Sequence, residues 1–140
     1  MRLAALAVTS ALAAAAAGPL PPLPLGRLLA PPDRLTLTVA HTGNPHTDGE
    51  YWLACDPVDG THPKADRACA RLAELARDGK DPFARAPRDE MCTMADGGPA
   101  TARVRGTWQG REVDTTFRRR NGCEIKRWNE LEPLLPGRSR

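Results

Sequence analysis

The stretch ATARVRGTWQGREVDTTF, residues 100–117, predicts a β-hairpin with Gln109-Gly110 at its turn. Apolar and polar residues alternate on both sides of the turn, which is typical of strands that bury one face. This is the clearest hairpin that the sequence predicts. The residues expected on its buried face are Ala102, Val104, Trp108, Val113, Thr115 and Phe117, with Arg103 and Arg105 on the opposite face.

Two further strands are predicted upstream of this hairpin. Residues 35–39 alternate leucine and valine with threonine, and residues 50–55 form a second run rich in apolar and aromatic side chains. The loop between them, residues 41–49, contains several glycine, asparagine and proline turn signals. We expect these strands to pair antiparallel, and we expect residues 56–63 to form a turn-rich connection.

Helices are predicted at two places. Residues 64–77 gather alanine, leucine and cysteine on one face and charged residues mostly on the other, with Pro63 suited to the first turn and Gly79 to the end. A second helix is predicted within residues 123–135, where Pro133 and Pro136 limit its length.

The N-terminus has the features of a secretory signal. Arg2 precedes an apolar run, and residues 15–17 offer the small side chains of a cleavage site. We assign residues 1–17 to a signal peptide, residues 18–32 to a proline-rich linker expected to be disordered, and residues 33–140 to one domain. The mature protein is expected to be secreted, extracellular and free of the membrane.

The four cysteines predict two disulfides, as is usual in small exported domains. Spacing alone allows three pairings. Cys69, on the buried face of the first predicted helix, can reach Cys55 at the end of the preceding strand.

Several classes of function are disfavoured. The net charge of +3 is low for a nucleic-acid-binding protein, and we expect residues 118–120, three arginines, to be solvated at a strand end. His41, His46 and His62 lie at irregular spacing and are expected on solvated loops, so neither a metal site nor a cofactor is predicted. The chain lacks a plausible Ser-His-Asp constellation, so we expect no enzyme.

The hexapeptide Met91-Cys92-Thr93-Met94-Ala95-Asp96 is the candidate functional stretch. A half-cystine precedes Met94 by two residues, and small, polar and flexible residues follow it. A methionine exposed on such a loop would serve as bait for a protease. The alternative is a surface loop whose methionines fold back onto the domain.

The sequence resembles the Streptomyces subtilisin inhibitor-like family. The resemblance extends over about residues 35–124 and is fairly specific when its motifs are taken together. These motifs are the strand Leu35 to Val39, Cys55, Gly60-Thr61-His62-Pro63, Ala68-Cys69-Ala70 with Leu72, Met91-Cys92 with Met94, Gly106 with Trp108-Gln109-Gly110, and Cys123-Glu124.

The resemblance implies an α+β fold, with a five-stranded antiparallel sheet, two helices packed on one face, and the disulfides Cys55–Cys69 and Cys92–Cys123. It implies a homodimer that inhibits subtilisin-like serine proteases by the standard mechanism, with Met94-Ala95 as the reactive bond. Met91, Cys92, Thr93 and Asp96 would then contact the protease. The alternative function is that of a secreted, disulfide-stapled domain that binds another protein without inhibiting it.

The chain departs from the family pattern around this bond and at its end. Thr93 stands where proline is usual and Ala95 where valine is usual, and Gly97-Gly98 lies within the segment that follows the bond. We expect the two glycines to loosen the loop and weaken inhibition. Residues 130–140 replace an apolar strand of the family, which leaves open how the sheet is completed.

Overall fold

The computed structural model describes residues 18–19 and 32–138 of the chain. The predicted signal peptide, residues 1–17, and most of the predicted linker, residues 18–32, therefore lie outside the described residues.

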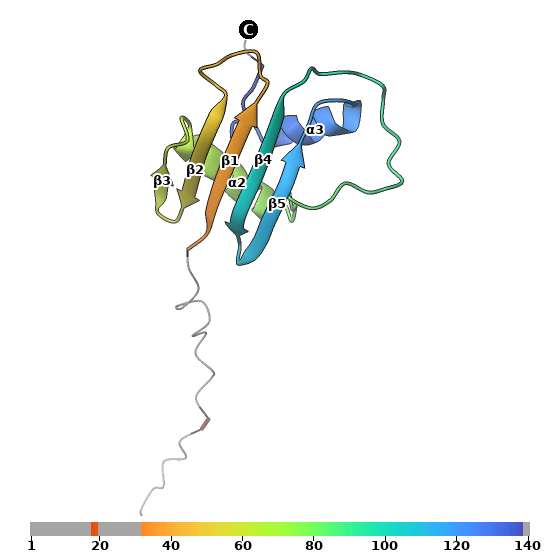
Figure 1. Cartoon of the computed structure of the whole chain (residues 1–140). Helices are drawn as coiled ribbons and strands as arrows, with labels where there is room; N and C mark the ends of the chain where they lie inside the picture. Colours follow the sequence, from red (N-terminus) through yellow and green to blue (C-terminus); the bar gives the residue numbers. More distant parts are fainter. Residues whose placement is uncertain (1–17, 20–31, 139–140) are drawn as a thin grey trace, which may run out of the picture.

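The described chain is built on a five-stranded antiparallel sheet with the order β3-β2-β1-β4-β5 (Figure 1). The predicted hairpin is confirmed, since Trp108 pairs with Arg111 across the turn and Ala102 pairs with Phe117 at the far end. The strands are β1 (Arg34–Ala40), β2 (Gly49–Cys55), β3 (Val58–Gly60), β4 (Thr101–Trp108) and β5 (Arg111–Phe117).

The fifth strand comes from a segment that the sequence indicated only as a turn-rich connection. β3 has three residues and pairs with the end of β2, where Val58 lies opposite Cys55. Three residues are too few to show an alternating pattern, so periodicity could not reveal this strand. The fifth strand of the sheet thus lies within residues 56–63.

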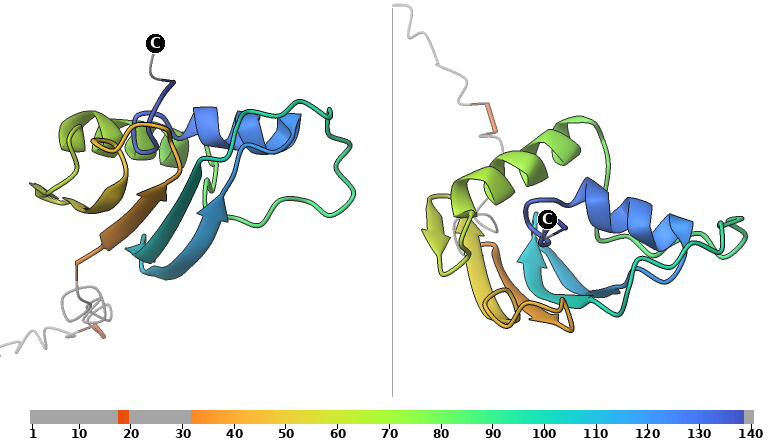
Figure 2. Two further views of the ribbon diagram at one scale, coloured as in Figure 1. Left: turned by 45° about the horizontal axis from the view of Figure 1, so that its top comes forward. Right: turned by 90° about the horizontal axis from the view of Figure 1, so that it is seen from above.

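Two helices, α2 (Ala65–Arg77) and α3 (Gly122–Glu130), cover one face of the sheet (Figure 2). α3 ends at Glu130 and is shorter than the range 123–135 within which it was predicted. Pro133 explains the early end, because proline disfavours helical geometry in the residue before it and supplies no N–H. Leu131, Leu134 and Leu135 are nevertheless buried, so the C-terminal turns still contribute to the core.

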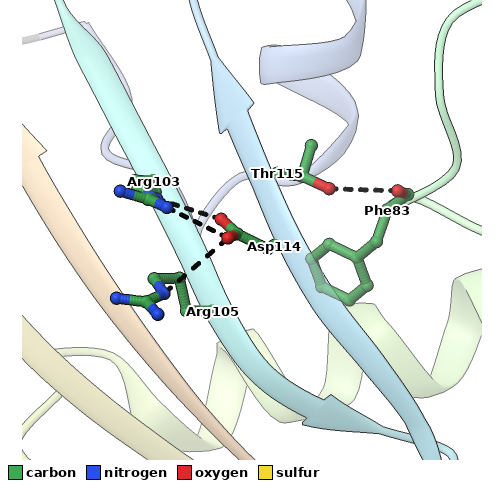
Figure 3. Close-up of polar contacts among 5 residues, drawn as sticks. All are labelled: Phe83, Arg103, Arg105, Asp114 and Thr115. Atoms are coloured by element: carbon green, nitrogen blue, oxygen red, sulfur yellow. Dashed lines mark hydrogen bonds and ion pairs between the residues drawn. The ribbon is translucent and has the colours of Figure 1, made fainter.

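The core lies between the helices and the sheet. Its largest fully buried side chains are Trp128, Phe117 and leucines from β1, β2, α2 and the C-terminal turns. Phe83, from the segment after α2, joins this core, and its carbonyl oxygen accepts a hydrogen bond of 3.1 Å from the Thr115 hydroxyl on β5 (Figure 3). The segment that leaves α2 is thereby fastened to the sheet before it continues toward residues 91–98.

The other face of the sheet is polar. Arg103 on β4 donates two hydrogen bonds to the Asp114 carboxylate on β5, at 2.9 and 3.0 Å, and Arg105 Nε lies 3.9 Å from the same carboxylate (Figure 3). The hydrogen bonds from Arg103 lower the pKa of Asp114 and raise that of Arg103. This face therefore carries fixed charges in place of a second hydrophobic layer.

His62 is not a solvated loop histidine, and that expectation was wrong. Its side chain is buried at 8% exposure, with Nε2 2.8 Å from the carbonyl oxygen of Leu134 and Nδ1 accepting a bond of 3.0 Å from the Lys64 N–H. These contacts fit a neutral imidazole that carries its proton on Nε2, because Nδ1 must accept. His62 thus ties the start of α2 to the C-terminal turns.

The buried imidazole predicts that stability falls in mildly acidic solution. Burial lowers the pKa of His62 below its ordinary value, so the unfolded chain binds the proton more readily. The contribution of the neutral His62 side chain to the free energy of unfolding is fully present above about pH 6.5 and is lost as pH falls through the lower folded-state pKa. We expect chemical denaturation of wild type between pH 7.5 and about 5 to show this loss, and His62→Gln to reduce it. The exposed-site control His46→Gln should retain the wild-type dependence, and an equal dependence in His62→Gln would contradict the assignment.

Candidate functional site

Residues 91–98, the exposed loop, project from the body of the domain between α2 and β4 (Figures 1 and 2). Met91 and Met94 are 97% and 95% exposed, so the alternative in which the methionines fold back onto the domain is wrong. Both side chains are therefore almost fully accessible to a partner.

The loop rests on residues 119–123, the anchor segment, which connects the end of β5 to the first turn of α3. On the N-terminal side of Met94, Cys92 is joined to Cys123 by a disulfide with Cα atoms 5.3 Å apart. The Gly122 N–H donates a hydrogen bond of 3.0 Å to the carbonyl oxygen of Thr93. A side chain at position 122 would collide with the Thr93 hydroxyl, so glycine permits this close approach.

The C-terminal side of the loop is held by the same anchor segment. The Gly97 N–H donates a hydrogen bond of 2.6 Å to the carbonyl oxygen of Arg119. Asp96 accepts one bond from the Gly98 N–H at 2.9 Å and one from the Arg120 guanidinium at 3.2 Å. These contacts, above all the bond from Gly98, lower the pKa of Asp96 and keep it ionised.

Arg119 is buried, at 6% exposure, and the expectation that all three arginines of residues 118–120 are solvated was wrong for it. Its Nε lies 3.4 Å from the carbonyl oxygen of Gly97, and its Nη1 donates a bond of 3.1 Å to the Asn129 side chain on α3. The guanidinium carbon is 5.4 Å from the centre of the Trp128 ring, within cation–π range. Strand alternation gave a signal for this burial, because Val113, Phe117 and Arg119 fall on the same side if the pattern of β5 continues.

A helix cap keeps the anchor segment in place. Asn121 is the N-cap of α3, and its side-chain oxygen accepts a bond of 2.9 Å from the Glu124 N–H. The Glu124 carboxylate in turn accepts a bond of 2.8 Å from the Arg120 N–H. This is a variant of the capping box, in which a side chain from the first turn reaches back to the preceding backbone. The sequence Asn121-Gly-Cys-Glu124 thus sets both the helix start and the surface that supports the loop.

These contacts leave Met94-Ala95 between two fastened flanks. Thr93 and Gly97, which immediately flank the tripeptide Met94-Ala95-Asp96, are bonded through their backbones to Gly122 and Arg119, while Met94 and Ala95 are exposed. Such an arrangement can offer one peptide bond to an extended binding cleft while restricting the conformations on either side.

The described residues do not favour metal chemistry at this site. Glu90, Cys92 and Cys123 lie close together, but both sulfurs are in the disulfide and so no thiolate is available as a ligand.

No helix in the described part of the chain is long and apolar enough to cross a membrane.

Comparison with protein families gives a match over residues 31–121 to the model described as subtilisin inhibitor-like. The matched range includes the exposed loop and most of the anchor segment, up to Asn121. The chain belongs to the subtilisin inhibitor-like family.

Curated relatives agree with this membership in the subtilisin inhibitor-like family. The subtilisin inhibitor of Streptomyces violaceus is 36% identical over 130 residues, covering 88% of this chain and 86% of the relative. Kexstatin-1 of Streptomyces platensis is 34% identical over 121 residues, covering 84% and 81%. Among solved structures, Streptomyces caespitosus sermetstatin in complex with Bacillus licheniformis subtilisin matches with a TM-score of 0.44 and 24% identity, covering 74% of this chain and 99% of the other.

Membership in the subtilisin inhibitor-like family places the chain among protease inhibitors and not among enzymes. The fold and both disulfides that the resemblance implied are also confirmed, since Cys55 pairs with Cys69 and Cys92 with Cys123. The residues that sequence reasoning missed are the buried Arg119, its partner Asn129 and the close-approach Gly122.

In this member of the subtilisin inhibitor-like family, Gly97 and Gly98, which follow Asp96, each have a specific local geometry. Gly98 has φ of +98°, which only glycine adopts without strain. At Gly97 a Cβ atom would lie 2.9 Å from the Cβ of Arg119, which is closer than real contacts allow. Gly97 therefore permits the close approach of the loop to the anchor segment, and Gly98 permits a positive φ. The loosening expected from the two glycines stays a prediction.

We accordingly expect Gly98→Ala to weaken inhibition of subtilisin about tenfold, because the backbone strain costs about 1–2 kcal/mol. Gly97→Ala should also weaken inhibition, since Arg119 must move. The control is Gly110→Ala at the hairpin turn, where φ is +73° but no contact with the exposed loop exists. Melting temperatures should fall for Gly98→Ala and Gly110→Ala, because both substitutions strain the backbone. Inhibition constants should rise only for the loop variants Gly97→Ala and Gly98→Ala. Equal inhibition by wild type and both loop variants would contradict the fitted geometry.

Proposed function

We propose that this chain is a secreted inhibitor of subtilisin-like serine proteases, with Met94-Ala95 as its reactive bond. The observation that carries the proposal is the 95% exposed Met94, held between flanks that are both fastened to residues 119–123. Membership in the subtilisin inhibitor-like family supports it.

The exposed loop supplies what a serine protease binds in a substrate. Met91, Cys92 and Thr93 would pair as an extended strand with the edge of the enzyme's cleft through backbone hydrogen bonds. The long, unbranched Met94 side chain would enter a broad apolar specificity pocket. The carbonyl carbon of Met94 would then receive the attack of the catalytic serine, with its oxygen in the oxyanion hole. Asp96 would lie on the leaving-group side.

The contacts to the anchor segment explain why binding would end in inhibition. A loop that already has the bound shape loses less conformational entropy when it enters the cleft. After attack, the disulfide and the Gly122–Thr93 bond would hold the Met94 side, while the Gly97–Arg119 bond would hold the Ala95 side. The new ends stay close, so the peptide bond can form again before either product leaves.

We further propose that the mature protein begins after a signal peptide of residues 1–17 and forms a homodimer. The polar sheet face is the candidate dimer surface, because the helices cover the opposite face (Figure 2). Sedimentation equilibrium should give twice the mass of one mature chain, and the mass of a single chain would contradict this part of the proposal.

Titration of active subtilisin with purified mature protein tests the inhibitory function. Activity should fall linearly to near zero at one inhibiting site per enzyme, and mass spectrometry should find any slow cleavage between Met94 and Ala95. Rapid digestion of the loop without loss of enzyme activity would contradict inhibition. Binding without loss of activity would favour the alternative of a non-inhibitory binding domain.

A further inference from the structure

We propose that Arg119, held by Asn129, is a positioning residue that retains the Ala95 side of the reactive bond after cleavage and so favours resealing. This inference rests on the proposed function and assigns part of it to a buried guanidinium. Neither residue contacts the bond directly, since Arg119 acts through the Gly97 backbone.

The surroundings of Arg119 are unusual for a buried cation. Within the described part of the chain it forms no ion pair with a carboxylate. Its polar contacts are instead the Gly97 carbonyl at 3.4 Å and the Asn129 side-chain oxygen at 3.1 Å, with the Trp128 ring beneath the guanidinium. Buried charges require such partners, so the loop carbonyl is part of what makes the buried position tolerable.

Gly97 is held to Arg119 at two points. The Gly97 N–H donates to the Arg119 carbonyl oxygen at 2.6 Å, and the Gly97 carbonyl oxygen faces the Arg119 side chain at 3.4 Å. Asp96 adds an ion pair with Arg120, but both of those side chains are more than half exposed and the pair is screened by solvent. The contact least open to water on this flank is therefore the one that Arg119 makes.

The position of this contact matters for the two ends produced by cleavage. The Met94 side stays linked through the Cys92–Cys123 disulfide, but no disulfide holds the Ala95 side. From Ala95 the chain next becomes regular at Thr101, where β4 begins. The contacts between Gly97 and Arg119 shorten the free segment to Ala95 and Asp96. The effective concentration of the new Ala95 amine beside the Met94 acyl group is therefore raised.

The chemistry that this hold favours is the reverse of acyl-enzyme formation. The Ala95 amine attacks the carbonyl carbon of Met94, which is esterified to the protease serine. A C–N bond forms and the C–O bond to the serine breaks. The proton of the amine passes through the enzyme's histidine to the leaving serine oxygen. No other reactant is needed, and competing hydrolysis requires that the amine first move away.

The test compares Arg119→Met, which keeps an unbranched apolar stem but removes the guanidinium, with Arg118→Met at the exposed neighbouring position. Each purified protein is incubated with catalytic amounts of subtilisin, starting once from intact and once from Met94-Ala95-cleaved protein. Mass spectrometry follows the ratio of cleaved to intact chain until both starts converge. Circular dichroism and thermal melting establish that each variant is folded under the conditions used.

For Arg119→Met we expect the equilibrium ratio of cleaved to intact protein to rise on the order of tenfold, and resealing from the cleaved form to slow by a similar factor. Arg118→Met should match wild type. Asn129→Ala, at an exposed position on α3, should shift the ratio in the same direction, and Asn129→Asp should restore it because an acceptor oxygen is kept. Asn129→Ala also provides the decisive variant if Arg119→Met does not fold.

Several results would overturn the inference. One is a folded Arg119→Met protein with the wild-type ratio and resealing rate, and another is an Asn129→Ala protein with wild-type behaviour. A variant that lowers the melting temperature while leaving both quantities unchanged would show that Arg119 is only structural. If wild type itself fails to inhibit subtilisin, the proposed function is wrong and this inference falls with it.

Discussion

Replacement of Cys92 and Cys123 together by serine is expected to turn the protein from an inhibitor into a substrate that subtilisin cuts between Met94 and Ala95. The disulfide joins residues 31 positions apart, and closing a loop of this size removes chain entropy worth roughly 3–4 kcal/mol. Cys92 is also only two residues from Met94, so loss of the crosslink frees the segment that must stay in the bound shape. We expect inhibition to weaken about 100-fold or more.

The measurement is incubation of the double variant with catalytic amounts of subtilisin, with fragments followed by mass. The matched control replaces Cys55 and Cys69, which close a ring of 14 positions far from the exposed loop. That control should lower stability by about 3 kcal/mol but remain inhibitory below its melting temperature. A Cys92/Cys123 variant that stays folded, uncut and equally inhibitory would show that the backbone hydrogen bonds alone make the loop rigid.

Met94→Lys is expected to transfer inhibition from subtilisin-like toward trypsin-like proteases. The side chain before the reactive bond enters the main specificity pocket, and a lysine there would place a charge in an apolar pocket of the first class but opposite a carboxylate in the second. Loss of a central contact in such interfaces costs about 2–4 kcal/mol, which corresponds to roughly 30- to 1,000-fold weaker inhibition of subtilisin.

Inhibition constants against both protease classes provide the measurement. Met91→Lys is the matched control, because Met91 is 97% exposed on the same loop and Met94 is 95% exposed. The control should keep the wild-type preference, since Met91 lies three residues before Met94. If Met91→Lys changes the protease preference and Met94→Lys does not, the reactive bond lies elsewhere in the loop.

Much of the fold could be predicted because its elements carry strong local patterns. Residues 100–117 showed the alternation and turn of β4 and β5, and residues 64–77 showed the apolar face of α2. The disulfide pairing came from the family resemblance, because spacing permits three arrangements. β3 was missed because three residues carry no period, and the end of α3 was placed too late because buried leucines continue beyond Glu130.

The sequence predicted the exposed residues of the candidate site but not the contacts that hold the loop in place. The half-cystine and the small residues around Met94 indicated exposure from the sequence alone. The role of Arg119 depends on Gly97 and Asn129, which lie 22 and 10 positions away in the chain, and local patterns do not report such contacts. His62 was misplaced for the same reason, since its buried partner Leu134 is 72 positions away.

The five consecutive residues 119–123 hold the chain on both sides of Met94-Ala95. The residues that a protease would recognise are therefore different from the residues that make the loop rigid. Residues 94 and 95 can be substituted without loss of the loop conformation, because Met94 and Ala95 are exposed and hydrogen bonds from neighbouring residues shape the loop. Residues 119–123 cannot be replaced one at a time, since Gly122 and Arg119 contact the loop as well as the helix start or the core, and Asn121 caps α3. Libraries that vary residues 94 and 95 on this chain should therefore yield folded proteins directed at different proteases, whereas diversity at residues 119–123 should be selected against on folding alone.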